Sequence, residues 1–302
     1  MKPPITLQGN GTGPQLSNIV AGAWRLASWG FSDQETLAWI ETCIELGITS
    51  FDHADVYGDY TVEALFGDAL AHAPASLRAQ VRVVTKCGIK LLSGRRPLHR
   101  IKSYDTSAQH IRASVDASLK NLRIDNIELL LLHRPDLLAN PSEIASVIDA
   151  LRSEGKVRHF GVSNHSTAQF ALLNRSVSLA TNQVQFSPLC LDALNDGTLD
   201  QCTELGLRPM IWSPLAGGKL MIGTDERSVK VRSVLSDIAQ AHGIALSTAA
   251  FAWIARHPSR PLIVTGTHRA EGLAEAVAAL AVDLGREEWY QVWRVGAGRE
   301  VA

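Results

Sequence analysis

The sequence lacks the features that mark several common classes of protein. Only four cysteines occur in 302 residues, without a C-x-x-C pair or zinc-finger spacing, which favours a reducing cytoplasm over a disulfide-stabilised fold. No apolar run reaches the roughly 18 residues that a membrane-spanning helix needs, and the N-terminus MKPPITLQGN lacks the apolar core of a signal peptide. We therefore expect a cytoplasmic protein with no membrane partner.

An excess of charge of either sign is also missing. The 29 Lys and Arg residues nearly balance the 30 Asp and Glu residues, so the formal net charge is −1. A protein that binds polyanions would carry a strongly positive field. We expect no nucleic-acid partner, and we take a monomer as the default because the sequence leaves the oligomeric state open.

What the chain does contain is the pattern of a large α/β fold. Hydrophobic residues make up 46% of the chain, enough for a large core. From about residue 19, short β-rich runs alternate with helical periodicity and no linker interrupts them, which predicts a single domain over residues 1–302. The predicted strands are 19–24, 49–51, 81–87, 127–133, 157–163, 180–186, 208–213 and 261–265. The predicted helices are 37–46, one capped by Thr61, 107–122, 141–153, 166–173, 197–205, 246–256 and 271–280.

Eight strands that alternate with helices predict parallel strands joined by right-handed crossovers, and eight such strands can close into a barrel. The predicted fold is therefore a (β/α)8 TIM barrel of the α/β class. An N-terminal β-hairpin is predicted from 5–7 and 16–19, turning at GNGTG, and the tail 286–302 forms a C-terminal extension. An open doubly wound sheet is the alternative, but no G-x-G-x-x-G follows the first strand. Two long loops, 89–106 and 216–228, are expected to be functional or mobile.

Lone polar residues stand where three of these strands end. The stretch 47–67, GITSFDHADVYGDYTVEALFG, carries Asp52 at a strand end and Tyr57 in the following turn, while Lys86 ends VRVVTK and His133 ends IELLLLH. In a barrel these strand ends share one mouth, so the side chains can converge. An Asp that pairs with a Lys keeps a cation near the phenol, which would lower its pKa toward neutrality, and a His can orient a carbonyl oxygen. The pattern predicts a site that donates a proton to a carbonyl.

A metal-dependent hydrolase or isomerase is a second interpretation of the same residues. Carboxylates and imidazoles at a barrel mouth often bind metal ions. The possible ligands are Asp52, His53, Asp55 and His133. This interpretation leaves Lys86 and Tyr57 without a role, so the predicted site contains no metal.

The stretch 47–67 resembles the signature of the aldo-keto reductase family. In that signature, G-x-x-x-x-D is followed by Tyr five residues later and by Glu before a Gly on a helix. Here these residues are Gly47, Asp52, Tyr57, Glu63 and Gly67. Further segments resemble the family along essentially the whole chain: GKVRHFGVSN, TNQVQFSP, WSPLAGG and VTGTHRAEGLAEA. The chain looks most similar to a small bacterial branch of predicted oxidoreductases, and the resemblance implies the catalytic tetrad Asp52, Tyr57, Lys86 and His133.

The resemblance also implies a nicotinamide dinucleotide that lies extended across the barrel mouth. Gly22, Ala23 and Trp24 would lie beside its ring, Ser163, Asn164 and Gln183 would bind the carboxamide, and Trp212 would stack on the ring. The implied contacts to the rest of the cofactor are Ser213, Leu215, Gly217 and Lys219 near the pyrophosphate, and Gly266, Thr267, Arg269 and Glu275 near the adenosine.

The adenosine end departs from the commoner family pattern. Many members have a basic residue at the start of the last loop and an Arg and an Asn in the following helix, where this chain has Gly266, Gly272 and Ala276. Arg269 is the best candidate for the 2′-phosphate of NADP, with His268 second. NADPH is therefore the expected cofactor, and NADH is less favoured.

The function implied by the resemblance is NADPH-dependent reduction of a small aldehyde or ketone to an alcohol, with Tyr57 as the proton donor. Trp24, Trp29 and the two long loops are expected to wall the substrate pocket. A cofactor-sensing regulatory subunit that keeps this fold without catalysis is the non-enzyme alternative. The sequence does not specify the substrate.

Overall fold

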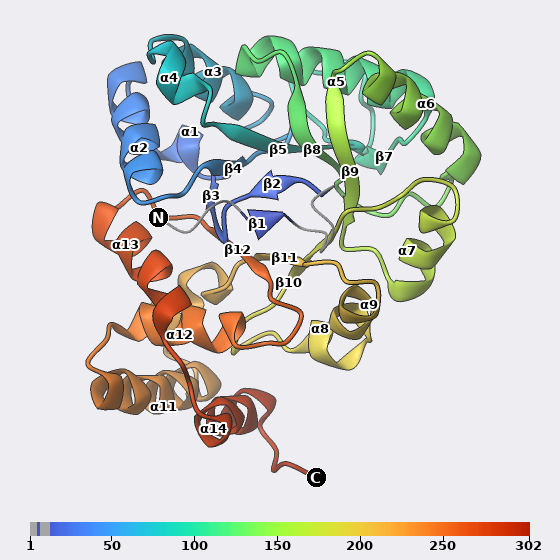
Figure 1. The fold of residues 1–302 in the computed structure, drawn as a ribbon. Helices are drawn as coiled ribbons and strands as arrows, with labels where there is room; N and C mark the ends of the chain where they lie inside the picture. The colour runs from blue at the N-terminus through green and yellow to red at the C-terminus, as the bar shows by residue number, and fades with distance from the viewer. Residues whose placement is uncertain (1–4, 7–12) are drawn as a thin grey trace.

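The computed structural model describes residues 5–6 and 13–302, and its centre is a closed barrel of eight parallel strands (Figure 1). Around the barrel the strand order is β10-β11-β12-β3-β4-β5-β8-β9. Each of the eight predicted strand regions contributes one strand, so the (β/α)8 barrel is confirmed. The barrel strands are β3 (Ile19–Gly22), β4 (Ser50–Asp52), β5 (Arg82–Cys87), β8 (Ile127–Leu132), β9 (Val157–Ser163), β10 (Asn182–Gln185), β11 (Met210–Trp212) and β12 (Leu262–Thr265).

Helices form the layer outside the barrel (Figure 1). The longer ones are α2 (Asp33–Glu45), α3 (Val62–Ala71), α5 (Ala108–Leu122), α6 (Pro141–Ser153), α7 (Thr167–Asn174), α9 (Thr198–Glu204), α11 (Glu226–His242), α12 (Leu246–Ala255), α13 (Ala270–Ala278) and α14 (Arg286–Ala297). Short turns of helix are α1 (Leu26–Trp29), α4 (Ala75–Arg78), α8 (Asp192–Asn195), η1 (Ala216–Gly218), α10 (Lys219–Ile222) and η2 (Ala279–Ala281). In the described part of the chain no single helix is long and apolar enough to cross a bilayer, although the pair α11 and α12, bent by 96°, reaches that length and composition jointly.

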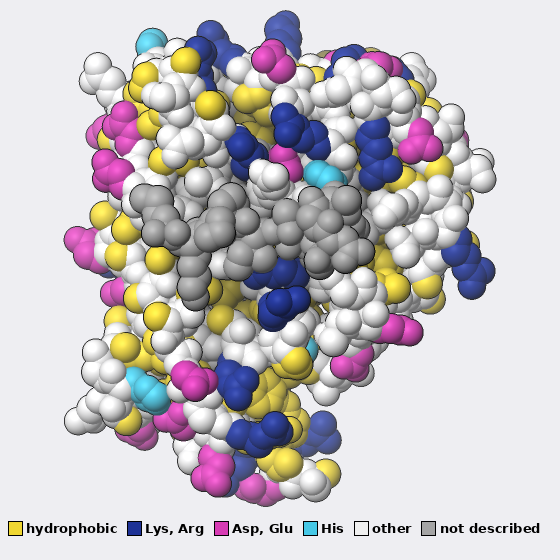
Figure 2. Space-filling view, viewed as in Figure 1, with side chains coloured by type: hydrophobic (Ala, Val, Ile, Leu, Met, Phe, Trp, Pro, Cys, Tyr) yellow, Lys and Arg dark blue, Asp and Glu magenta, His cyan; other side chains and the backbone are white. Residues whose placement is uncertain are grey.

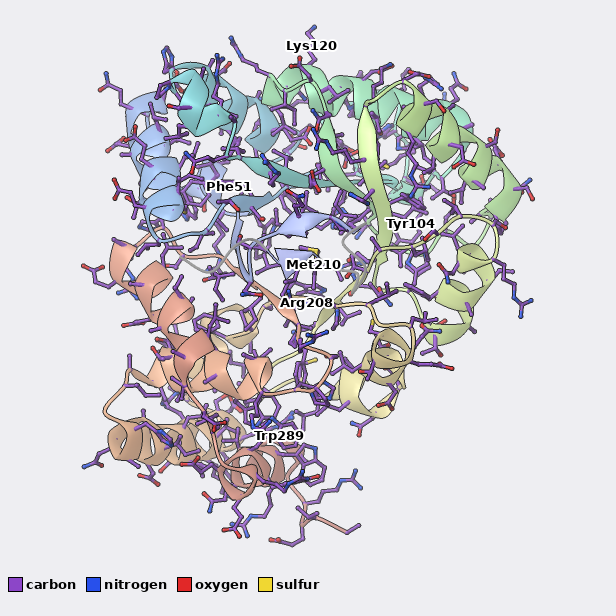
Figure 3. All side chains as sticks on the ribbon, in the orientation of Figure 1. Phe51, Tyr104, Lys120, Arg208, Met210 and Trp289 are labelled. Atoms are coloured by element: carbon purple, nitrogen blue, oxygen red, sulfur yellow. The ribbon has the colours of Figure 1, made fainter. Side chains whose placement is uncertain are left out.

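Alternation along each strand separates the barrel interior from the helix layer, because successive side chains of a strand point to opposite faces. On β8, Leu129 and Leu131 pack inside the barrel with Met210, whereas Leu130 and Leu132 pack under the helices. Figure 3 shows Met210 near the centre of the barrel. The same alternation decides which polar residues reach the interior at the strand ends.

The N-terminal hairpin is present as β1 (Ile5–Thr6) and β2 (Gln15–Leu16), which pair antiparallel and lie across the barrel (Figure 1). Leu16 is fully buried in the interior cluster, and the backbone amide of Gln15 donates to Glu128 at 2.8 Å. The hairpin therefore covers the end where the strands begin. The predicted second strand, 16–19, was too long because residue 19 already belongs to β3, and residues 7 and 9–12 of the predicted hairpin lie outside the described residues. On this face, acidic and basic side chains surround the residues that are not described (Figure 2).

Gly67, the last residue of the signature, has a packing role. A Cβ atom at this position would lie 2.0 Å from the carbonyl oxygen of Asn121, which is closer than any real contact. The absence of a side chain therefore lets α3 lie against the end of α5. Thr61, predicted to cap α3, does precede this helix, but its hydroxyl donates to the carbonyl oxygen of Gly58 at 2.6 Å and caps no helix amide.

The C-terminal extension packs on the barrel domain through two tryptophans. The rings of Trp253 on α12 and Trp289 on α14 stack with 5.0 Å between centroids and 9° between planes. Each indole N–H donates to the backbone carbonyl of the other residue, at 2.9 and 3.0 Å. Figure 3 shows Trp289 in α14, beside the helices that α14 covers.

The two long loops have more structure than the sequence predicts. Residues 89–106 contain a second small hairpin, β6 (Ile89–Lys90) with β7 (Ser103–Tyr104). Residues 216–228 hold η1, α10 and the start of α11, so their prediction as a loop was wrong. The helix α11 was not predicted, because only Ser228, Val231, Leu235, Ile238 and Ala239 are buried in an otherwise polar segment.

Candidate active site

Asp52, Lys86 and Tyr57 form one hydrogen-bonded group at the end of the barrel where the strands finish. Asp52 is the last residue of β4, and Lys86 is the second-last residue of β5. The Lys86 ammonium donates to both carboxylate oxygens of Asp52, at 2.8 and 2.7 Å, to the Tyr57 hydroxyl at 3.1 Å and to the carbonyl oxygen of His53 at 2.7 Å. Lys86 is 1% exposed, so this arrangement supplies partners to a cation that has no access to water.

His133 follows β8 and completes the predicted group of four. Its ring lies edge-on to that of Tyr57, with 5.9 Å between centroids. Burial lowers the pKa of His133 well below its usual value, and the positive charges of Lys86, Arg134 and Lys102 lower it further. The imidazole is therefore neutral near pH 7, where it can hydrogen-bond an oxygen but cannot act as a strong acid.

The lysine and the tyrosine both keep their protons. Burial alone would lower the pKa of Lys86, but the charge of Asp52 and the hydrogen bonds of Lys86 to Asp52 and Tyr57 outweigh burial, and the pKa is raised. For Tyr57, burial is the largest influence and raises the pKa, while Lys86 acts in the opposite direction. The predicted lowering of the Tyr57 pKa toward neutrality was therefore wrong in net sign, because burial outweighs the nearby cation.

His53 and Asp55 do not join this group as metal ligands would. His53 directly follows Asp52, so its side chain points to the opposite face. Its ring packs against Phe66 of the helix layer, with 4.5 Å between centroids. Burial, assisted by the charge of Lys86, lowers the pKa of His53 to about 3. In the part of the chain that the structure describes, no three His, Cys, Asp or Glu side chains are arranged to hold a metal ion. The geometric basis of the hydrolase or isomerase interpretation is thus lost.

A second chain of hydrogen bonds joins β9, β10 and β11 to the same carboxylate. The side-chain amide of Gln183 donates to Asp52 Oδ1 at 2.8 Å, and the Ser163 hydroxyl donates to the backbone carbonyl oxygen of Gln183 at 2.9 Å. The Asn164 amide donates to Ser163 Oγ at 2.7 Å, and the Trp212 indole donates to Asn164 Oδ1 at 3.1 Å. These predicted cofactor residues therefore share one network with the tetrad.

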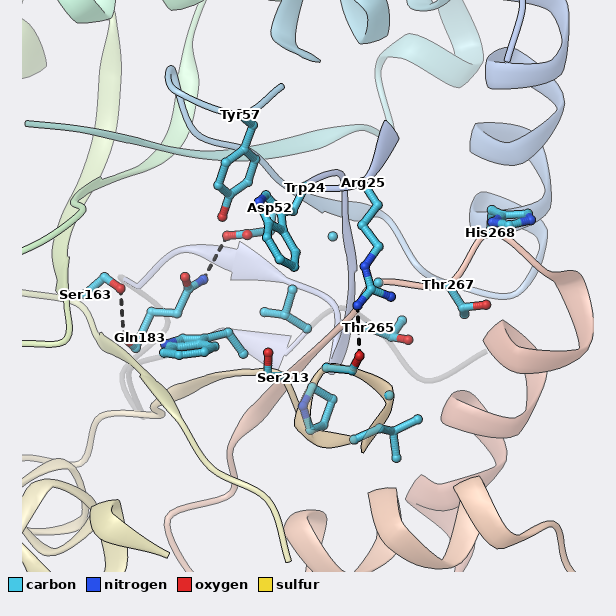
Figure 4. Close-up of a pocket in the computed structure, with 18 of the residues that line it drawn as sticks. Trp24, Arg25, Asp52, Tyr57, Ser163, Gln183, Ser213, Thr265, Thr267 and His268 are labelled. Carbon is cyan, nitrogen blue, oxygen red and sulfur yellow. Dashed lines mark hydrogen bonds between the residues drawn. The ribbon is translucent and has the colours of Figure 1, made fainter. Parts of the chain in front are cut away.

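The site opens into a cavity of about 580 Å³. This size lies within the usual range for small-molecule and cofactor sites, about 300–1,000 Å³. Figure 4 looks into the cavity, with Tyr57 and Asp52 facing Gln183 and Ser213. The predicted site residues that line it are Gly22, Trp24, Asp52, Tyr57, His133, Ser163, Gln183, Trp212, Ser213, Leu215, Gly217, Gly266, Thr267 and Arg269. Trp29, Leu91 and Gly218 line it as well, so both expected tryptophans and both long segments, 89–106 and 216–228, contribute to its wall.

Five predicted site residues do not line the cavity. Lys86 and Asn164 lie behind it and act through the hydrogen bonds described above. Ala23 is fully buried, and its amide donates to the backbone carbonyl of Asp52 at 2.9 Å. Lys219 pairs with Asp225 at 3.3 Å, and Glu275 accepts a hydrogen bond from Ser247. Ala23, Lys219 and Glu275 thus have partners within the protein, and their cofactor contacts stay predictions.

The loop after β11 turns tightly beside the cavity and contains several residues with positive φ angles. Ser213, Ala216, Gly217 and Gly218 have positive φ angles of 52°, 51°, 68° and 100°. Two of these amides bond within the loop, because Ala216 N donates to the Ser213 carbonyl oxygen at 2.8 Å and Gly218 N donates to that of Leu215 at 3.0 Å. Arg25 donates to the carbonyl oxygen of Gly217 at 3.0 Å, which adds a positive charge beside this loop (Figure 4). Arg25, which lines the cavity, is thus the charged group beside this loop that could meet a pyrophosphate.

Sequence reasoning missed two arginines that line the cavity, Arg25 and Arg134. Each directly follows a residue that was predicted, Trp24 in the first case and His133 in the second. Adjacency to a predicted site residue was therefore the available signal, although it does not tell which way a side chain points.

Comparison with known proteins gives consistent matches along the chain. A sequence model described as "Aldo/keto reductase family" matches residues 18–296. The uncharacterized oxidoreductase YcsN of Bacillus subtilis is 43% identical over 290 residues, 95% of this chain and 96% of the relative. A 6-dehydroglucose reductase of Agrobacterium fabrum is 40% identical over 291 residues, 95% of this chain and 97% of the relative.

Solved structures agree with these matches. The crystal structure of an aldo/keto reductase from Klebsiella pneumoniae in complex with NADP and acetate superposes with a TM-score of 0.78 at 26% identity, covering 97% of this chain and 95% of the other. The family resemblance of the sequence is thereby confirmed over nearly its whole length. The chain belongs to the aldo/keto reductase family.

Proposed function

We propose that this protein is an NADPH-dependent reductase that converts an aldehyde or a ketone to an alcohol. The observation that carries the proposal is the hydrogen-bonded group of Asp52, Lys86 and Tyr57, with neutral His133 beside it, at the open end of the barrel. A relative at 43% identity is named an oxidoreductase, one at 40% is named a 6-dehydroglucose reductase, and the Klebsiella structure contains NADP, which supports the same chemistry here.

Each of the four residues has a definable task. Bound NADPH would supply the hydride to the carbonyl carbon. The Tyr57 hydroxyl donates its proton to the substrate oxygen, which gains negative charge during the reaction. The Lys86 ammonium, 3.1 Å from the Tyr57 oxygen, stabilises the phenolate that this transfer leaves, and Asp52 holds Lys86 in place. Neutral His133 donates a hydrogen bond that orients the carbonyl oxygen.

The cavity offers matching places for the parts of a nicotinamide dinucleotide. Trp212 provides a flat face for the ring, and the Gln183 side-chain carbonyl, which the network leaves free of a donor, can accept from the carboxamide. The loop from Ser213 to Gly218 would hold the pyrophosphate. Arg269 is exposed and lines the cavity at the start of α13, where it would bind the 2′-phosphate.

The proposal is tested by fluorescence titration with NADPH and NADH, followed by a panel of carbonyl compounds. The panel includes 6-dehydroglucose, because relatives at about 40% identity carry the name 6-dehydroglucose reductase. We expect tighter binding of NADPH than of NADH and consumption of NADPH with at least one carbonyl. Tight binding without turnover of any carbonyl would favour a cofactor-sensing subunit, and binding of neither cofactor would refute the proposal.

A further inference from the structure

Arg134 is a charged residue in the wall of the cavity, and the proposed reaction gives it no role. It directly follows His133 and lines the same cavity as His133, Tyr57 and Trp212. One guanidinium nitrogen donates to the carbonyl oxygen of His133 at 2.8 Å, and the guanidinium carbon lies 5.9 Å from the centre of the Trp212 ring. The backbone contact leaves the other N–H groups of this half-buried arginine available to a ligand.

No carboxylate neutralises Arg134 within the described residues, where it forms no ion pair. Asp52 is the one carboxylate among the residues that line the cavity, and it already accepts from Lys86 and Gln183. Asp136, two residues further on, accepts from the amide and hydroxyl of Thr106 instead. A half-buried cation without a counter-ion is desolvated without compensation, so an anion that enters the cavity would be favoured there.

The other charged groups near Arg134 also favour an anion on this side of the cavity. Burial lowers the pKa of Arg134, and the groups that oppose this effect are the phenols of Tyr104 and Tyr57, with no carboxylate among them. The pKa of His133 is lowered by burial and by the positive charges of Lys86, Arg134 and Lys102. No anion acts to raise it. This side of the cavity is therefore electropositive close to where a carbonyl would react.

The position of Arg134 separates it from the groups suited to the cofactor phosphates. Arg269 follows β12, whereas Arg134 follows β8, and these two strands lie opposite each other in the closed barrel. The loop with positive φ angles follows β11 and already has Arg25 beside it. Arg134 is thus left to the part of the cavity beside Tyr57 and His133.

We propose that Arg134 binds an anionic group of the substrate, so that the preferred substrates are oxo acids, with a carboxylate separate from the carbonyl that is reduced. A guanidinium presents paired N–H groups that match the two oxygens of a carboxylate. This inference rests on the proposed reductase function and adds the charge class of its substrate.

The test compares substrates that differ only in charge. The pairs are 3- and 4-carboxybenzaldehyde against 3- and 4-carbamoylbenzaldehyde, which have similar size and aldehyde reactivity. In the wild-type protein we expect kcat/KM to favour the carboxylate by about 10-fold or more for at least one pair, and Arg134→Met to abolish this preference, mainly through KM. Arg134→Lys keeps the charge without the planar fork and should retain part of the preference. Arg100→Met removes an exposed charge of the loop 89–106 that does not line the cavity, and should leave the preference intact.

Equal kcat/KM for both members of each pair in the wild type, or a preference that survives in Arg134→Met, would overturn the inference while leaving the reductase function standing. A readout without turnover separates the two proposals. Calorimetry with NADP-loaded protein compares 4-(hydroxymethyl)benzoate with 4-(hydroxymethyl)benzamide. If no aldehyde is reduced, the reductase proposal fails, and the inference is then judged by whether the carboxylate binds more tightly and loses this advantage in Arg134→Met.

Discussion

Replacing Asp52 with Asn removes the negative charge beside the buried Lys86 while keeping the shape of the side chain. Lys86 is 1% exposed and bonds to both carboxylate oxygens, at 2.8 and 2.7 Å, whereas its other two acceptors, the His53 carbonyl and the Tyr57 hydroxyl, are neutral. Removing one partner of a buried ion pair costs about 3–5 kcal/mol, because the remaining charge stays buried without compensation. We therefore expect Asp52→Asn to lose about that much unfolding free energy at pH 7.

The loss should depend on pH in a direction that the structure determines. In the wild-type protein the pKa of Lys86 is raised, so its contribution to stability is complete below the unfolded-state pKa of about 10.4 and is lost only as the pH rises through the folded-state value. Without Asp52, burial dominates and places the folded-state pKa below 10.4. Between these two pKa values the unfolded variant binds more protons than the folded variant, so the variant gains about 1.4 kcal/mol of stability per pH unit.

Urea unfolding of both proteins, followed by tryptophan fluorescence at pH 7, 8 and 9, measures this effect. The matched control is Asp149→Asn, since Asp149 has a 70% exposed side chain and meets Arg152 at 3.6 Å on the surface of α6. An exposed pair of this kind contributes about 1 kcal/mol or less, so the control should show a small change that does not vary with pH. A loss below about 1 kcal/mol for Asp52→Asn at pH 7, or a loss that stays constant as the pH rises, would refute the reasoning.

Three further predictions concern separate parts of the molecule. The folded-state pKa of His53 is about 3, so its contribution to stability is complete above the unfolded-state pKa of about 6.5 and is lost as the pH falls toward 3. In urea unfolding between pH 5 and 6.5, His53→Leu should make the rise of unfolding free energy with pH shallower by about 1 kcal/mol per pH unit. Gly67→Ala should cost about 1–3 kcal/mol in urea unfolding, because its Cβ would lie 2.0 Å from the Asn121 oxygen, whereas Gly94→Ala meets open space and should change little. Arg269→Ala should raise the Kd for NADPH about 10-fold and leave that for NADH nearly unchanged in fluorescence titrations.

Sequence reasoning brought Asp52, Lys86 and His133 together because they are lone polar groups at strand ends, and the family resemblance implied that they form a tetrad with Tyr57. The side chains of Asp52 and Lys86 both point into the barrel, because side chains alternate between the two faces along a strand. Closure of the barrel then brings the ends of the two strands together. Neither step needs detailed packing, so the strand pattern was enough to predict that these side chains converge, while their roles came from the resemblance. The site roles of these residues remain predictions that the variants test.

The rest depended on local geometry that a sequence does not contain. Lys219 and Glu275 lie in the expected segments, but their side chains meet Asp225 and Ser247 on neighbouring helices. Arg134 lines the cavity, whereas an arginine that follows a strand is more often solvated, so the sequence alone does not indicate this position.

The sign of the net pKa shift of Tyr57 and the helix α11 were missed for related reasons. The pKa reflects a balance between burial and the charge of Lys86, and burial is known only from the packed structure. The helix buries a narrow stripe against its neighbours, so its sequence carries little apolar periodicity, and tertiary contacts supply the stability that the sequence pattern does not indicate.

The most direct test of Tyr57 as the proton donor is the variant Tyr57→Phe, which removes one oxygen atom. The measurement combines NADPH fluorescence titration with steady-state reduction of the best carbonyl from the panel. We expect the Kd for NADPH to change by less than about threefold while kcat falls by about 10²–10⁴-fold, the usual contribution of a positioned acid. Turnover within about tenfold of the wild-type rate would contradict the proposed mechanism.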